Sequence, residues 1–354
     1  MNILQVVRRF GPVGGMERYV WELTRELAAM GHHLQVLCEV DLSPKPLANV
    51  EVHALGTVHP KPRWLAHIRF SKRVDRWLEQ HPQSDTIIHS HERISRHQVT
   101  TFHGPPFAQI YDQPVWKRLS LRARMNLWLE RRELCCKQVQ TIVPNSLRIA
   151  EELESYYPEV KARISKPVVP GVKPCTKRQP RNIAADAGVI GFVGKEWKRK
   201  GLAMVVDIIS ALAEQRPNLT FIVAGPLEEN ICHLFKSAPF DYRLLGEVDS
   251  RELYQQFDLL LHPARQEPFG MVITEALSAG VPVVISDLCG AATEVTPSKG
   301  TVLALNASIE QWVKASDFWL NGSDHNIDYH HGWENVASEY EQLYRTIEPY
   351  RVSQ

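Results

Sequence analysis

Short apolar runs that alternate with stretches of helical periodicity limit what this chain can fold into. Residues 17–31 place Val20, Leu23, Leu27 and Met30 on one helical stripe, and a glycine then stops the pattern. Apolar runs that read as strands occur at residues 2–7, 33–38, 86–89, 99–102 and 140–143. This repeated strand–helix–strand order is typical of a doubly wound parallel sheet, so we predict an α/β fold.

The pattern breaks at residues 165–188, where four prolines and a basic run indicate a linker. A second cycle follows, with strands expected at 189–193, 219–224, 259–262 and 281–286 and a helix at 203–214. We therefore predict two Rossmann-like domains, residues 1–168 with a C-terminal tail of about 335–354, and residues 169–334. We expect the domains to face a cleft that takes a ligand, and the last helix, 333–346, to pack back toward the N-terminal domain.

The cysteines and the apolar runs bear on cellular location. None of the six cysteines forms a C-x-x-C pair, which argues against a zinc site or a disulfide framework and fits a reducing cytosol. The chain lacks a run of about 18 apolar residues, so we expect no membrane-spanning helix. Residues 1–10 read as a first strand and not as a secretion signal. We therefore expect a cytoplasmic protein.

The stretch ARQEPFGMVITEALSAGVP, residues 264–282, places two glutamates around a helix start. The helix is expected to begin near 269–270, so that the amides of 270–272 point outward and can hold a phosphate. Glu275 leans toward the same end and suits the two hydroxyls of a ribose, while Glu267 suits another hydroxyl-rich group. The alternative is an acidic first turn that only complements the helix dipole. The expected buried stripe is Val272, Ile273, Ala276 and Leu277.

The loop GKEWKRKG, residues 194–201, offers cations at another strand end. Lys195 and Lys200 can neutralise a diphosphate leaving group, whose negative charge grows as the sugar–phosphate bond breaks. A solvated basic loop is the alternative, and it fits Lys198 and Arg199 better. A glycine pair before the first helix would also let a phosphate approach the backbone.

Taken in order, these segments resemble the large retaining glycosyltransferase family four, which has the GT-B fold. The resemblance covers nearly the whole chain and is strongest over residues 189–295. Its most specific mark is the E-x-F-G-x-x-x-x-E element, here Glu267 to Glu275, followed by Ala276, Gly280 and Pro282. The other matching motifs are Gly14-Gly15-Met16-Glu17, Thr101-Phe102-His103-Gly104, Gly194-Lys195 with Lys200-Gly201, Val223-Ala224-Gly225, and the last helix from Trp333 to Tyr344.

The resemblance implies that residues 1–168 bind the acceptor and residues 169–334 bind a nucleotide-sugar. The catalytic residues that it implies are Glu267, Lys200, Lys195 and His103. The donor-binding residues that it implies are Gly15, Gly194, Gly246, Glu247, Phe269, Gly270, Met271, Val272 and Glu275. Within these sets, Glu275 would hold the ribose, the lysines would bind the diphosphate, and His103 would contact the donor sugar through its backbone or its imidazole.

The resemblance also implies the chemistry. A UDP-sugar or GDP-sugar would donate its sugar to a hydroxyl with retention of configuration, without a cofactor or an evident enzymatic nucleophile. The chain has no Asp-x-Asp motif, so we expect no bound metal. Lys195 stands where the family often has arginine, and a lysine cannot form the bidentate contact that a guanidinium makes with a phosphate. Cys289 stands where the family commonly has glycine, so this loop would meet its donor differently.

The first half of the chain is basic. Residues 1–168 carry 24 Lys/Arg and 17 Asp/Glu, whereas residues 169–354 carry 17 and 23. Two stretches, 61–77 and 116–137, read as basic amphipathic helices with two tryptophans each. They predict contact with an anionic membrane surface and a glycan or lipid-linked acceptor, as in lipopolysaccharide or exopolysaccharide synthesis. A solvated helix face with tryptophan in the core is the alternative. Nothing resembles a nucleic-acid-binding module.

Two further alternatives concern the site. His89, His91 and His103 could suggest a metal, but they follow separate strands without a metal-binding motif, so surface or sugar-contacting histidines are the preferred interpretation. A sugar-nucleotide epimerase or phosphorylase of the same fold, or a non-catalytic sugar-nucleotide-binding protein, are the rival functions. The retained Glu267, Lys200 and Glu275 favour a transferase over them.

Overall fold

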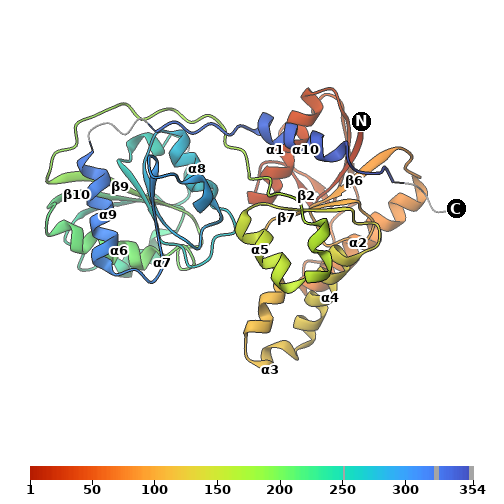
Figure 1. Cartoon of the computed structure of the whole chain (residues 1–354), viewed down its shortest axis with the longest axis horizontal. Coiled ribbons are helices and arrows are strands. Elements are labelled where there is room, and N and C mark those ends of the chain that lie inside the picture. The colour runs from red at the N-terminus through yellow and green to blue at the C-terminus, as the bar shows by residue number, and fades with distance from the viewer. Residues whose placement is uncertain (250–251, 323–326, 351–354) are drawn as a thin grey trace. The chain divides into compact units, whose positions relative to one another are not determined.

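The computed structural model describes residues 1–249, 252–322 and 327–350, which form two compact units (Figure 1). Unit 1 comprises Met1–Gly171 and Trp333–Gln354, and unit 2 comprises Val172–Gly332. Each unit contains a six-stranded sheet in which the paired strands run parallel. The predicted α/β class with two Rossmann-like sheets is therefore confirmed, and the predicted domain boundaries lie close to those of the units.

The sheet of unit 1 has the strand order β5-β3-β1-β6-β7-β8. Its strands are β1 (Asn2–Val6), β3 (His33–Cys38), β5 (Val50–Ala54), β6 (Thr86–Ser90), β7 (Val99–Phe102) and β8 (Thr141–Pro144). A separate short pair joins β2 (Arg9–Phe10) to β4 (Val40–Asp41). All residues of β6 and β7 are buried, as expected for a parallel sheet covered on both faces.

The helices of unit 1 correct one prediction. They are α1 (Gly15–Ala29), α2 (Arg63–Gln80), α3 (Val115–Arg118), α4 (Leu121–Cys135), α5 (Leu147–Tyr156) and α10 (Trp333–Tyr344), with the 3₁₀ turns η1 (Phe107–Asp112) and η2 (Pro158–Arg163). The single helix predicted at 116–137 is wrong, because Ser120 interrupts it. The Ser120 hydroxyl accepts a hydrogen bond from the Ala123 amide at 3.2 Å and so caps a new helix.

The C-terminal helix α10 belongs to unit 1, as predicted. It packs against α1, and its side chains Tyr340 and Tyr344 are buried there. Tyr340 receives a hydrogen bond from the hydroxyl of Tyr19 on α1 at 3.0 Å. The end of the chain therefore completes the core of the unit that its beginning forms.

Unit 2 repeats the architecture with the strand order β11-β10-β9-β12-β13-β14. Its strands are β9 (Ala187–Val193), β10 (Asn218–Ala224), β11 (Asp241–Leu244), β12 (Leu259–His262), β13 (Val283–Ser286) and β14 (Gly300–Leu303). Its helices are α6 (Leu202–Ala213), α7 (Glu228–Ile231), α8 (Met271–Ser278) and α9 (Ile309–Asn321), with the turns η3 (Cys232–Leu234), η4 (Tyr254–Gln256) and η5 (Gly290–Glu294). Phe192, Phe221 and Trp312 are fully buried in its core. The predicted phosphate-binding loops follow β9 and β12.

Candidate functional site

The N-terminus of α8 forms the centre of the candidate site in unit 2. Gly270 precedes the helix with a φ of +102°, a conformation that side chains rarely adopt. A Cβ at this position would also lie 3.0 Å from Cγ of Glu267. The amides of Gly270, Met271 and Val272 donate to no described residue, so they remain available to an anion.

The buried face of α8 differs in part from the prediction. Ile273, Ala276 and Leu277 are buried as expected, but Val272 is only half-buried and Thr274 takes its place in the interior. Thr274 can be buried because its hydroxyl donates to the Met271 carbonyl at 3.1 Å. Phe269, just before the helix, is buried, and its carbonyl accepts a hydrogen bond from the Ala291 amide at 2.8 Å.

Glu267 lies within a cluster of basic side chains. Its Oε2 is 3.3 Å from Lys200 Nζ, 3.3 Å from Arg199 Nη1 and 3.7 Å from His262 Nε2. Burial acts to raise the pKa of Glu267, but the His262 contact and the charges of Lys200 and Arg199 outweigh it and lower the pKa to about 2. Glu267 is therefore ionised at neutral pH and holds Lys200 in place.

Arg199 and His262 had no site role in the sequence-based prediction. Arg199 was assigned to a solvated loop, and this is wrong: it is half-buried, and its guanidinium donates to the Gln266 carbonyl. His262 ends β12 and is fully buried. Burial lowers the pKa of His262, so a neutral imidazole lies behind Glu267. A histidine that closes an apolar strand, LLLH, was the signal that could have identified it.

Gly194 allows Lys200 to reach Glu267. This glycine follows β9 with a φ of +146°, and a Cβ on it would lie 2.4–2.7 Å from Cδ, Cε and Nζ of Lys200. The lysine side chain thus lies directly across the glycine, and only 12% of it is exposed. Gly194 was predicted to contact the donor. In this structure it leaves the space that the Lys200 side chain occupies.

Lys195 is separated from this cluster. Its Nζ pairs with Glu247 Oε2 at 2.6 Å, and both side chains are more than half exposed. The structure therefore brings together two predicted site residues, Lys195 and Glu247, but does not bring Lys195 to Glu267. Gly246, next to this pair, has a φ of +62° and accepts a hydrogen bond from the Gly225 amide at 2.6 Å.

Glu275 has a partner that the sequence did not reveal. The hydroxyl of Tyr254, a buried residue in η4, donates to Glu275 Oε2 at 2.7 Å. Glu275 itself is half-buried on α8. The Cys289 loop supports the same segment, because the Gly290 amide donates to the Glu267 carbonyl at 2.9 Å. The two glutamates are therefore oriented before any ligand binds.

Unit 1 contains an open cavity of about 1210 Å³. Strand-end loops and helices line it, including His91, Glu92, Arg93, His103 and Gly104, and α4 contributes Arg122, Asn126 and Glu133. Arg8 and Arg9 in its wall are paired with Glu39 and Glu17. Lys61, Arg63 and Arg122 make no side-chain hydrogen bond or ion pair with a described residue, and all three are exposed. The cavity therefore has unpaired positive charge at its rim.

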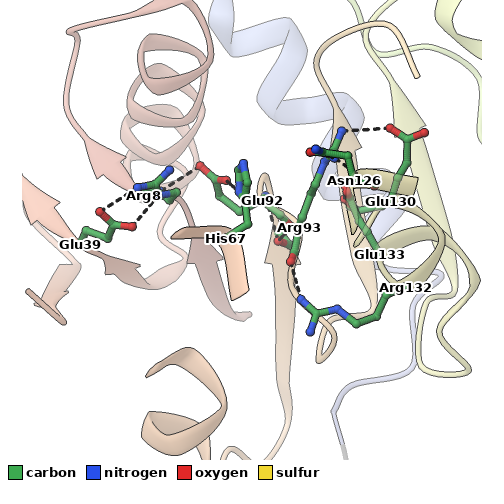
Figure 2. A network of polar contacts seen from close by, with 11 residues as sticks. Arg8, Glu39, His67, Glu92, Arg93, Asn126, Glu130, Arg132 and Glu133 are labelled. Atoms are coloured by element: carbon green, nitrogen blue, oxygen red, sulfur yellow. Dashed lines mark hydrogen bonds and ion pairs between the residues drawn. The ribbon is translucent and has the colours of Figure 1, made fainter. Parts of the chain in front are cut away.

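The carboxylates of the cavity wall are held in a network (Figure 2). Glu92 accepts from the Arg8 amide at 3.3 Å and lies 3.5 Å from His67 Nδ1. Arg93 donates to Asn126 at 3.2 Å and to Glu130 at 3.0 Å. Burial raises the pKa of Glu133 to about 8, against the charge of Arg93, so this carboxyl is largely protonated at neutral pH.

The predicted surface position of the histidines is wrong for two of them. His89 and His91 are buried, and His103 is half-buried at the cavity. His91 Nδ1 lies 2.9 Å from His103 Nε2. The His103 carbonyl accepts from Asn145 at 3.1 Å, which favours the imidazole as the ligand-facing group. In the part of the chain that the structure describes, no three His, Cys, Asp or Glu side chains are grouped to bind a metal ion.

The tryptophans of the two basic stretches differ in environment. Trp77 lies in the core and Trp64 is half-buried, but Trp116 is 72% exposed and Trp128 is 48% exposed. The alternative interpretation, in which the tryptophans lie in the core, is therefore correct for Trp77 and wrong for Trp116 and Trp128. Within the described ranges, no helix combines the length and apolar character needed to cross a bilayer.

Gly15, a predicted donor-binding residue, begins α1 with open space beside it, since a Cβ there would meet nothing within 4 Å.

Two family models match the chain, one over most of each unit. Glycosyltransferase Family 4 matches residues 13–170, and Glycosyl transferases group 1 matches residues 176–335. The chain is 26% identical to D-inositol 3-phosphate glycosyltransferase of Corynebacterium urealyticum, over 95% of this chain and 92% of that protein. It is also 26% identical to lipopolysaccharide glucosyltransferase WaaG of Escherichia coli, over 86% and 85%.

Solved structures show the same fold. The crystal structure of WaaG, a glycosyltransferase involved in lipopolysaccharide biosynthesis, has a TM-score of 0.75 at 21% identity and covers 96% of this chain and 95% of that one. Anabaena HepE in complex with UDP and glucose has a TM-score of 0.67 at 18% identity and covers 98% and 100%. Both comparisons span the two units.

Proposed function

Since the chain belongs to the glycosyltransferases of group 1 and family 4, we propose that it moves a hexose from a UDP- or GDP-sugar to a hydroxyl, with retention of configuration. The observation that carries the proposal is the seating of Lys200 between Gly194 and Glu267. A fixed cation of this kind stabilises a diphosphate most as it leaves. The proposal needs neither a cofactor nor a metal.

The donor site is proposed in unit 2. The free amides of Gly270, Met271 and Val272 would receive phosphate oxygens, because a helix N-terminus attracts anions. Glu275, held by Tyr254, would accept the ribose hydroxyls. The exposed pair of Lys195 and Glu247 would contact the outer part of the nucleotide.

The acceptor site is proposed in the cavity of unit 1. The rim cations Lys61, Arg63 and Arg122 favour an anionic glycan, and α4 connects this rim to an exposed apolar surface. That surface is formed by Trp116 (72% exposed), Leu119 (71%) and Leu121 (64%). We therefore propose a lipid-linked acceptor at the inner face of the cytoplasmic membrane, in lipopolysaccharide or exopolysaccharide synthesis.

Donor use is tested by a thermal-shift screen of UDP, GDP and their hexose conjugates, followed by NMR of the transferred sugar. A donor at 100 times its Kd should stabilise the protein by about 2.7 kcal/mol. We expect the new linkage to keep the anomeric configuration of the donor. A product with inverted configuration would contradict the retaining mechanism, and the absence of any stabilising nucleotide would contradict the donor site.

Membrane docking is tested by sedimentation with anionic lipid vesicles. We expect the protein to sediment at low salt and less at high salt, since each basic residue near the surface adds roughly 1 kcal/mol that salt screens. A double variant, W116S with L119S, should bind at least about tenfold more weakly, because each buried apolar side chain contributes roughly 1.5–3 kcal/mol.

F318S provides the matched control for this experiment. Phe318 is 63% exposed on α9 of unit 2, whereas both basic stretches belong to unit 1, so its loss should leave sedimentation unchanged. If the unaltered protein stays in solution at low salt, or if F318S weakens binding as much as the double variant, the docking surface is wrong.

A further inference from the structure

A continuous chain of hydrogen bonds connects His103 at the cavity to the buried face of α10. It joins side chains from α1, β1, β6, β7 and α10, all within unit 1. The contacts, in order, are Tyr19–Tyr340 (3.0 Å), Tyr340–Thr101 (2.6 Å), Thr101–His89 (2.8 Å), His89–Tyr344 (2.6 Å), Tyr344–Gln5 (3.4 Å), Gln5–His91 (2.8 Å) and His91–His103 (2.9 Å). The residues of the chain other than His103 are buried.

Gln5 sets the direction of the bonds near the cavity. Its Nε2 donates to the Tyr344 hydroxyl at 3.4 Å, so its Oε1 faces His91 Nε2 at 2.8 Å. An amide oxygen only accepts hydrogen bonds, and His91 Nε2 must therefore carry the hydrogen. Burial lowers the pKa of His91 well below its ordinary value, so its other nitrogen, Nδ1, carries none.

The same reasoning determines which ring nitrogen of His103 carries the hydrogen. A bare Nδ1 on His91 can only accept, so His103 Nε2 must carry a hydrogen and donate it across 2.9 Å. Burial lowers the pKa of His103 to about 3, which leaves its Nδ1 with a lone pair and no hydrogen. His103 lines the cavity, and this Nδ1 has no hydrogen-bond partner among the described residues.

We infer that Gln5 and His91 are positioning residues that hold His103 as a neutral Nε2–H imidazole, whose Nδ1 accepts a hydrogen bond from a sugar hydroxyl in the cavity. The part of this inference that concerns the sugar rests on the proposed function. An acceptor nitrogen favours a ligand group that carries a hydrogen, and it disfavours a phosphate or ether oxygen at the same point. His103 thus selects a hydroxyl and does not act as a cation.

The tautomer can be read directly by NMR of the full-length protein with ¹⁵N-labelled histidine, using H103N to assign the signal. We expect His103 to be protonated at Nε2 in the unaltered protein. Q5M removes the amide acceptor and should raise the fraction of the Nδ1–H form. Q5E keeps an acceptor oxygen and should restore the Nε2–H form. A dominant Nδ1–H form in the unaltered protein, or no change in Q5M, would overturn the inference.

A second variant keeps the test valid if Q5M does not fold. Y344F removes the hydroxyl that orients the Gln5 amide and should also raise the Nδ1–H fraction, whereas an unchanged spectrum would overturn the role of Tyr344. With a donor in hand, Q5M should lower kcat/KM by about tenfold, the size of one hydrogen bond, and Q5E should recover it. The NMR result does not depend on turnover, so a failure of the proposed function would leave it intact.

Discussion

Replacing Lys200 with methionine is expected to lower kcat by about 10²–10³ while the donor Kd changes only a few-fold, as for loss of one group that meets developing charge. Methionine keeps an apolar stem across Gly194, so the loop geometry should persist. Glu267 also keeps Arg199 and His262 as neighbours. The measurement is steady-state turnover with the best UDP- or GDP-sugar, together with calorimetric titration of the same donor.

The matched control is Lys198→Met on the same loop. Lys198 lies over the ring of Trp197 at 5.1 Å and makes no contact with the Glu267 cluster. Turnover of this variant should stay within about twofold of the unaltered enzyme, as expected for a substitution away from the site. If K200M weakens donor binding as much as it slows turnover, Lys200 binds the ground state and the leaving-group role is wrong.

Replacing Glu130 with alanine is expected to destabilise unit 1 by about 3–5 kcal/mol, because the buried Ala108 amide and Tyr157 hydroxyl lose their acceptor and Arg93 loses its carboxylate partner. The Glu130 carboxylate accepts from the amides of Phe107 and Ala108 at 2.7 and 3.0 Å, from the Tyr157 hydroxyl at 2.8 Å and from Arg93 at 3.0 Å. Figure 2 shows its link to Arg93. Urea unfolding followed by tryptophan fluorescence measures the loss.

An exposed ion pair at the same helix gives the comparison. Glu159 pairs with Arg131 of α4 at 2.8 Å, with both side chains more than one third exposed. E159A should therefore change the unfolding free energy by no more than about 1 kcal/mol. Equal effects of E130A and E159A would show that the buried carboxylate is not the anchor of α4 that its contacts indicate.

The sequence predicted most of the strands and helices, and it drew attention to two residues that the structure brings into contact. Periodicity located nine of the twelve described strands of the two sheets, because each buried parallel strand is a short apolar run. It missed the edge strands β5, β11 and β14, whose residues are mostly exposed or half-buried and form no continuous apolar run. The E-x-F-G motif located the N-terminus of α8, and two of the predicted site residues, Glu267 and Lys200, lie 3.3 Å apart through Oε2 and Nζ. Both follow from local pattern and from the rule that loops at the carboxyl ends of parallel strands meet at one edge.

The rest depended on contacts between distant residues, which local pattern does not encode. Tyr254 reaches Glu275 from a separate turn, and Arg199 reaches Glu267 only because the strand order places the loop after β9 beside the loop after β12. The buried histidines were misjudged because polar residues are usually exposed, whereas here each finds a buried partner. The break at Ser120 could have been predicted from the sequence, because serine is a preferred N-cap residue.

The return of the chain end to unit 1 affects how the protein is made. During translation, Gln5, His89 and Thr101 are synthesised long before the tyrosines that bond to them, which follow 239 to 339 positions later in the chain. The nascent N-terminal region therefore keeps these polar groups without their tyrosine partners until α10 has been made. Unit 2 is synthesised before α10 and does not include it, so unit 2 can acquire its structure first.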